Sequence, residues 1–189
     1  MKGKKIDCMI LATFVATIFY ASTYPYIHRH IMGQVTDNLI ALNEIIDCVG
    51  VIISGAVWNK FSDKLFPFYP LFCILETIAD VSVTIWALSS GNLAAYYILG
   101  CIEFSVITRN MICGGNRLRI LRYQSDEERE HYQNNNNSAS AIATIIGSLI
   151  AMKLNLSFPV MLSLATFGNA TDNVFYMVIY YQTTRRKKN

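Results

Sequence analysis

Apolar residues fall into six long runs along the chain. The runs are Cys8 to Ile27, Leu39 to Trp58, Pro67 to Leu88, Leu93 to Cys113, Ser138 to Leu154 and Phe158 to Tyr181. An α-helix needs about 20 mostly apolar residues to cross the hydrocarbon core of a bilayer, and each run is close to that length. The pattern predicts an all-α integral membrane protein, with residues 1–189 forming a single domain of six transmembrane helices.

The placement of basic residues predicts an orientation. The chain has 189 residues, of which 53% are hydrophobic and only 15% charged. Under the positive-inside rule both termini are expected in the cytoplasm of a cell-membrane protein, and the net charge of +3 needs no nucleic-acid partner. The bases expected inside are Lys2, Lys4, Lys5, Lys60, Lys64, Arg117, Arg119, Arg122, Arg129, Arg185, Arg186, Lys187 and Lys188, and those outside are Arg29 and Lys153.

Other features have a plain structural interpretation. The first run follows three lysines but is long for a signal peptide and lacks a convincing cleavage site, so we expect a retained helix that closes on Pro25. The five cysteines lie in or beside apolar runs without CxxC spacing, and we expect small core residues. His28 and His30 have no further ligand at metal-binding spacing. We expect no metal and no cofactor.

Acidic residues inside the apolar runs are costly. A central charge costs about 2.5 to 3.5 kcal/mol on insertion scales, whereas each large apolar residue returns about 0.3 to 0.6 kcal/mol. These carboxyls must therefore be protonated, paired or facing water. Spacing puts Glu44 with Asp47, and Glu76 with Asp80, on one helix face each. The candidate proton and solute sites are Glu44, Asp47, Glu76, Asp80, Glu103 and Asp172, against Arg109 as the single base away from the run ends.

Two local patterns concern helix faces. Thr13, Thr17, Tyr20 and Tyr24 share a face of the first helix, which would line a water-filled cavity or bond back to its own backbone. Small residues recur every four positions at Ala143, Gly147 and Ala151, which favours close helix packing.

Two further predictions concern the polar stretches. Ser125 and Glu128 fit a capping box, so a helix is expected to start there and lead into the fifth run. Arg109 is expected to be an interfacial anchor whose stem reaches toward the cytoplasm.

The stretch Gly55 to Lys64 is predicted to be a loop between the second and third helices. It reads Gly-Ala-Val-Trp-Asn-Lys-Phe-Ser-Asp-Lys and resembles the signature loop of major facilitator superfamily transporters: Gly, any three, Asp, base, any, Gly, base, base. Asn59 stands in place of the family's Asp, Ser62 in place of its Gly and Asp63 in place of one base. A short basic hairpin of another membrane protein is the alternative. The resemblance implies a cytoplasmic gating loop of Gly55, Asn59, Lys60, Asp63 and Lys64, with which Arg129 can pair.

Glu127-Glu128-Arg129 likewise resembles the cluster that opens the family's fifth helix, so the resemblance covers the family's N-terminal six-helix half. It implies a half-size transporter acting with a second six-helix half, either a second copy or a separate chain. We expect proton-coupled export or exchange of small cationic or amphipathic solutes, with Glu44 and Asp47 as exchange sites because helix 2 borders the cavity in the family.

Two alternatives stay open: a non-transporting accessory or truncated subunit, and acids that stay protonated and only bridge helices. We expect no enzyme, because the motifs of lipid phosphotransferases and a Ser/His pair for proteolysis are missing.

Overall fold

The computed structural model describes residues 7–153 and 156–186. Within those ranges all regular structure is helical, so the predicted all-α class is confirmed. The elements are α1 (Cys8–Met32), α2 (Asp37–Leu65), the 3-10 helix η1 (Phe66–Phe68), α3 (Tyr69–Ser90), α4 (Leu93–Glu103), the π-helix η2 (Phe104–Thr108), α5 (Arg109–Arg122), α6 (Asp126–Lys153) and α7 (Phe158–Arg186). Lys2, Lys4, Lys5, Leu154, Lys187 and Lys188, which were assigned above, lie outside the described residues.

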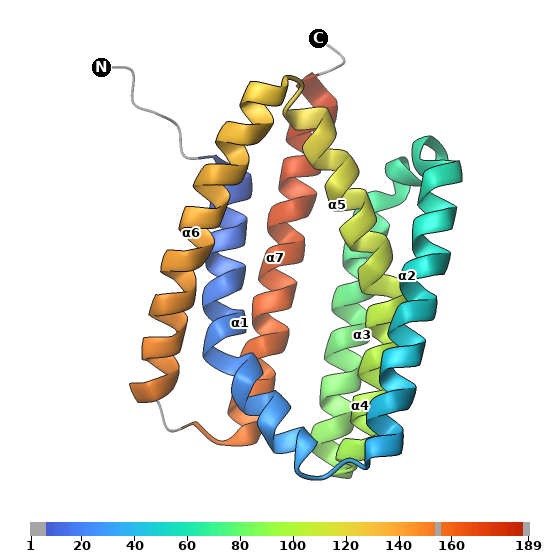
Figure 1. The fold of residues 1–189 in the computed structure, drawn as a ribbon, viewed down its shortest axis with the longest axis vertical. Coiled ribbons are helices and arrows are strands. Elements are labelled where there is room, and N and C mark those ends of the chain that lie inside the picture. The colour runs from blue at the N-terminus through green and yellow to red at the C-terminus, as the bar shows by residue number, and fades with distance from the viewer. Residues whose placement is uncertain (1–6, 154–155, 187–189) are drawn as a thin grey trace.

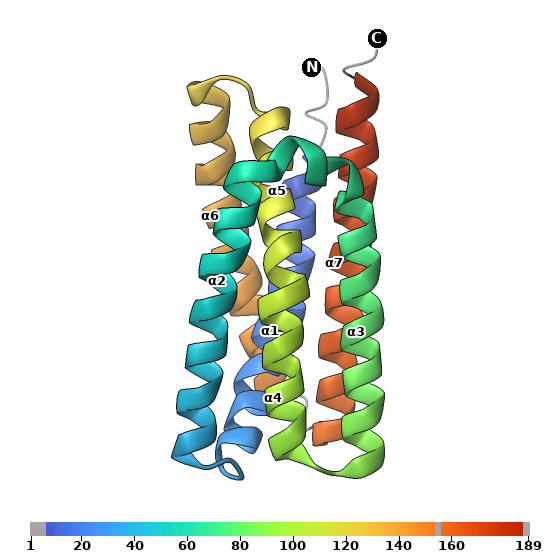
Figure 2. The same ribbon diagram turned by 90° about the vertical axis from the view of Figure 1, so that its right-hand side faces the viewer.

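The helices stand side by side and alternate in direction (Figure 1). One end of the bundle, here named the first end, holds the start of α1, η1, the turn between α5 and α6 and the end of α7. The opposite, second end holds the α1–α2 and α3–α4 turns. Helices α4, η2 and α5 continue one another as a single rod, which Figure 2 shows beside α2 and α3. Helix α1 packs against α6 and α7, α3 packs against α7, and α2 packs against the α4–α5 rod.

Two helical stretches of the described chain are long and apolar enough to cross a membrane, Cys8–Met32 and Asp37–Ser90. The second stretch contains the reversal at η1, so it comprises both α2 and α3. We predicted that the bases of α2, α5, α6 and α7 share one side. Those within the described ranges lie toward the first end, whereas Arg29 and Lys153 lie toward the second end.

The helices are longer than the apolar runs that predicted them. Helix α1 passes through Pro25 and ends at Met32, whereas a helix closing at Pro25 was expected. Helix α6 starts at Asp126, far ahead of the predicted Ser138, and its first three turns are polar. Hydropathy marks only the part of a helix that is apolar, while the backbone hydrogen-bond ladder continues as long as caps and propensity allow.

The prediction of a loop from Gly55 to Lys64 is wrong, because these residues form the last turns of α2. The backbone departs from helical angles only at Phe61, and the chain reverses at η1, where Pro67 takes an early position. Proline has no N–H to donate and is favoured at such a position. No Gly or Pro lies between Gly55 and Pro67 to end the helix earlier.

Helix ends are fixed by local polar contacts. Gly91 follows α3 with a φ of 66°, the left-handed conformation in which a residue without Cβ closes a helix. The Asn92 side chain then accepts the N–H of Ala95 at 3.1 Å and caps α4. These two residues make a tight turn between α3 and α4.

Close contact between α1 and α6 depends on small residues, as predicted. Ala143 and Ala151 are buried, and a Cβ built on Gly147 would lie 2.7 Å from the carbonyl oxygen of Ile18. Backbone atoms cannot move away as a flexible side chain can. Only glycine therefore fits at position 147.

We predict that Gly147→Ala lowers the free energy of unfolding by about 1 to 3 kcal/mol through overpacking. Gly55→Ala is the matched control, since a Cβ at Gly55 meets no atom within 4 Å. The control is expected to be neutral or to stabilise the helix by up to about 1 kcal/mol. Denaturant unfolding in detergent measures both variants, and equal effects would contradict the packing argument.

Candidate functional site

A cavity of about 470 Å³ lies between α1, α2, α3, α4 and α7, toward the second end. Its volume falls in the range of about 300 to 1,000 Å³ that suits small organic ligands. Its charged and aromatic lining comprises Glu44, Asp47, Asp80, Glu103, His28, Tyr20, Tyr24, Tyr96, Tyr97 and Phe104.

The cavity brings together four of the six acids singled out in the sequence: Glu44, Asp47, Asp80 and Glu103. Glu76 and Asp172 are not part of its lining and lie deeper in the bundle. Glu76 is 5% exposed, and one carboxyl oxygen of Asp172, Oδ1, is buried without a hydrogen-bond partner among the described residues. The candidate site is therefore a cavity with two further acids on its first-end side, Glu76, which is buried, and Asp172, which is half-buried.

Arg109 pairs with Asp47. The Nη2 atom of Arg109 lies 2.9 Å from both carboxyl oxygens of Asp47, and the guanidinium lies 4.8 Å from the centroid of the Phe104 ring. Both side chains of the ion pair are mostly covered, with 26% and 33% of their surfaces exposed. The expected role of Arg109 as an interfacial anchor is wrong, and Asp47 already has a cationic partner.

The acids of α3 are held by asparagines of α7. Asn169 donates to Asp80 at 3.1 Å, and Asn173 donates to Glu76 and to the hydroxyl of Thr77. The acids are four residues apart, and so are the asparagines, which gives two matching contacts between antiparallel helices. The spacing of these four residues is visible in the sequence, but nothing in the sequence indicates that α3 packs against α7.

Glu103 is held across the π-helix. The Thr108 hydroxyl donates to the Glu103 carboxyl at 2.9 Å, and the same hydroxyl lies 3.5 Å from Glu76. In a regular α-helix residues five apart point about 140° away from each other. The wider turn at η2, where the Arg109 N–H bonds to the carbonyl of Phe104, brings them to one face. Sequence spacing had no way to reveal this contact.

Aromatic rings form much of the remaining wall. Tyr20 and Tyr24 stack on each other with ring centroids 4.6 Å apart. Both line the cavity, so part of the predicted polar face of α1 faces it. Thr13 and Thr17 of that face are not among the lining residues. Tyr96 and Tyr97 enter from α4, and sequence reasoning did not single them out. Ring faces attract cations, so this wall complements the acids.

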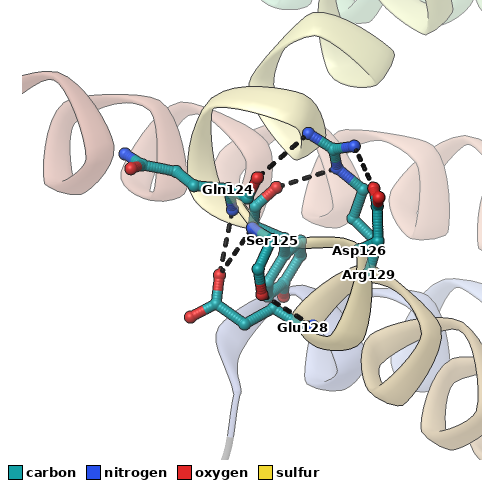
Figure 3. A network of polar contacts seen from close by, with 6 residues as sticks. Gln124, Ser125, Asp126, Glu128 and Arg129 are labelled. Atoms are coloured by element: carbon teal, nitrogen blue, oxygen red, sulfur yellow. Dashed lines mark hydrogen bonds and ion pairs between the residues drawn. The ribbon is translucent and has the colours of Figure 1, made fainter.

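The predicted gating contact between Arg129 and the segment after α2 is wrong. Arg129 instead bonds to the carbonyls of Tyr123 and Gln124 and to Asp126 at 2.9 Å (Figure 3). The predicted capping box is confirmed beside it: Glu128 accepts the N–H groups of Gln124 and Ser125, and the Ser125 hydroxyl accepts that of Glu128. Arg129 thus stabilises the α5–α6 turn.

Asp63 of the predicted gating set pairs with Arg117 of α5 at 2.6 Å, so α2 does contact the α5 side of this end. Gly55 is half-buried, and Asn59, Lys60 and Lys64 are exposed. In the described part of the chain the side chains of Asn59 and Lys64 take part in no hydrogen bond or ion pair, while Lys60 lies 5.4 Å from the ring of Phe61. The set therefore lies on the surface of the first end.

A packed cluster closes the bundle at the first end. Met9, Tyr69, Leu118 and Ile179 are fully covered there, together with Ala12, Cys73, Tyr123 and Tyr132. Asp7 caps α1, accepts the Tyr123 hydroxyl at 2.7 Å and lies 3.4 Å from Arg122. Burial, the hydrogen bond to Asp7 and its charge raise the pKa of Tyr123, so the phenol remains a donor at neutral pH.

Cysteines and histidines add little chemistry. Cys73 and Cys101 are buried as expected, whereas Cys48 is exposed. The described residues contain no group of three or more His, Cys, Asp or Glu side chains placed to hold a metal ion.

Comparison of the chain with protein-family models, with curated proteins and with solved structures found no match.

We predict that Arg109→Gln lowers the free energy of unfolding by about 1.5 to 3 kcal/mol, because it leaves the half-buried Asp47 carboxylate without its charged partner. Asp47→Asn added to Arg109→Gln should restore part of that loss. The exposed pair Asp63 and Arg117 supplies the matched control, for which Arg117→Gln should cost at most about 1 kcal/mol. Denaturant unfolding of the set as a double-mutant cycle is the measurement. A coupling energy near zero for Arg109 and Asp47 would contradict their pairing.

Proposed function

We propose that the chain is an integral membrane protein of six spans, one half of a major-facilitator-like transporter that exchanges protons for small organic cations. The observation that carries the proposal is the cavity of about 470 Å³, which combines uncompensated acids with aromatic walls. The cell membrane, with both termini in the cytoplasm, is the proposed location.

Two observations support a membrane setting. Large apolar side chains are exposed along the outer helix faces, among them Ile52, Ile85, Ile145 and Met152. Soluble monomers rarely expose apolar patches this extensive. The bases gathered at the first end fit a cytoplasmic side under the positive-inside rule.

The preference for cations follows from charge balance in the cavity. Asp47 is matched by Arg109, but the described residues offer Glu44, Asp80 and Glu103 no ion pair. A solute that brings its own positive charge, or protons, would compensate these acids. Ring faces of Tyr20, Tyr24 and Phe104 would add cation–π attraction for an organic cation.

A second six-helix half is proposed because Glu44 is exposed in the single chain. A carboxylate facing lipid at that depth is costly, whereas a second bundle placed over α1 and α2 would enclose it in an aqueous cavity. A second copy of this chain and a separate chain are both compatible with this requirement.

A non-transporting subunit is the second candidate. It is favoured by Arg129 bonding within its own turn and by the exposed position of Asn59, since the described residues then show no counterpart of the family's gating contact. The contacts Asn169 to Asp80 and Asn173 to Glu76 also favour a bridging role for those two acids. Transport measurements separate the two candidates.

We predict that proteoliposomes containing the chain transport tetraphenylphosphonium, an aromatic organic cation, when a pH gradient is imposed across their membrane. Glu44→Gln and Glu103→Gln should each reduce the flux about tenfold, the effect of losing a charge attraction of about 1.4 kcal/mol. Glu127→Gln, an acid at the exposed start of α6, is the control and should leave the flux unchanged. Flux that ignores both the gradient and the two cavity substitutions would reject transport and favour the subunit.

We predict a particle with two six-helix halves. In lipid nanodiscs the purified chain should show twice the mass of one chain if the halves are identical, because the proposed cavity is enclosed only by two bundles. Mass photometry or light scattering gives the value. A chain that transports while strictly monomeric would contradict the prediction.

A further inference from the structure

A single hydroxyl lies between two carboxyl groups on the first-end side of the cavity. The Oγ1 atom of Thr108 is 2.9 Å from Oε1 of Glu103 and 3.5 Å from Oε1 of Glu76. Glu103 lines the cavity, while Glu76 is 5% exposed and lies behind it. The three groups thus connect the cavity with the bundle interior.

Counting donors shows which proton is required for both contacts of Thr108 to be hydrogen bonds. A threonine hydroxyl has one O–H to donate and otherwise accepts. Two ionised carboxylates would both require that one proton, so both contacts are hydrogen bonds only if one carboxyl is protonated and donates to Thr108. The pair Glu76 and Glu103 then holds one proton between its members.

The neighbours of Glu76 determine which oxygen carries the proton. Thr77 donates its hydroxyl to the carbonyl of Cys73 at 3.0 Å, so it must accept from the amide nitrogen of Asn173 at 2.9 Å. This orients the Asn173 amide group, which donates to Oε2 of Glu76. A proton on Glu76 therefore belongs on Oε1, the oxygen that faces Thr108.

The titratable groups that face Glu76 are Cys73 and Asp80 on its own helix, Glu103 on α4 and Asp172 on α7. In the described ranges no base forms an ion pair with it. Oδ1 of Asn173 and Oδ1 of Asp172 are buried acceptors that receive no hydrogen bond from the described residues, and Asn173 is only 1% exposed.

We propose that Glu103, Thr108 and Glu76 form a proton relay that carries protons between the cavity and the buried acids of α3 and α7. The Oε1–H of Glu103 gives its proton to the Thr108 oxygen as the Thr108 O–H gives its own to Oε1 of Glu76. One O–H bond breaks and one forms at Thr108, the charge moves from Glu76 to Glu103, and no other reactant is needed. The relay deepens the proposed function, since it names the proton path from that cavity.

The relay is tested without any solute or gradient. The full chain in lipid nanodiscs is transferred from H₂O to D₂O, and infrared difference spectroscopy follows the carbonyl band of the protonated carboxyl, assigned to Glu76 by its loss in Glu76→Gln. Thr108→Val removes the hydroxyl at nearly constant volume and should slow deuterium exchange of this band about tenfold, the factor expected for one buried hydrogen bond. Thr108→Ser keeps the hydroxyl and should exchange at the native rate.

Thr171→Val is the control for replacing Thr by Val, because among the described residues the Thr171 hydroxyl bonds only to the carbonyl of Phe167 on its own helix. Gel filtration of all variants checks that they remain folded. Equal exchange in Thr108→Val and the native chain, or no carbonyl band that depends on Glu76, would overturn the relay. Native exchange behaviour in a chain that moves no cation would reject the proposed function and leave the relay intact.

Discussion

Carboxyl groups placed among apolar helices require partners, and this requirement shapes the interior of the bundle. Transfer of a polar group out of water without a hydrogen bond costs several kcal/mol, and an unpaired charge costs more. Asp47 meets Arg109, Asp80 meets Asn169, Glu76 meets Asn173 and Glu103 meets Thr108. The first contact joins α2 to α5, and the next two join α3 to α7. The acids therefore align helices as well as carrying charge.

Small residues permit the close helix approach on the other side of the bundle. Gly147 lets α6 contact the backbone of α1, and Gly168 lets α7 lie against Phe19 of α1, where an added Cβ would be 2.5 Å from that side chain. Helix α1 is thereby held between α6 and α7, and its tyrosines are presented to the cavity. The first end is closed by a separate apolar cluster around Tyr69 and Leu118. The cavity consequently lies toward the second end.

The π-helix links packing with chemistry. A Cβ at Gly50 would lie 2.6 Å from the Cβ of Ser105, which shows how closely α2 approaches the middle of the π-helix. The same wide turn brings Arg109 over Phe104 and Thr108 onto Glu103. Single π-turns occur often at functional sites. Here the turn places Arg109 opposite Asp47 and leaves Glu103 for the cavity.

Local patterns determined much of the fold. The spacing of apolar residues predicted the helical segments, the Ser125 and Glu128 pair predicted the start of α6, and the small residues of α6 predicted its packing face. All three patterns depend on residues within one or two helical turns of each other, so they can be recognised in the sequence. The prediction of a loop at Gly55 to Lys64 is wrong because the chain has no helix-breaking Gly or Pro between Gly55 and Pro67, so α2 continues through this stretch.

The partners of the acids were decided by tertiary structure alone. Sequence spacing grouped Glu44 with Asp47 and Glu76 with Asp80, but it could not choose which helix lies opposite each face. In a regular α-helix, with 3.6 residues per turn, Glu103 and Thr108 would point apart. The single π-turn changes the angular register, and it lies where α2 approaches closely, with Gly50 against Ser105. The sequence by itself therefore determined that buried acids exist, and only the packing of helices decided which of them are paired and which face the cavity.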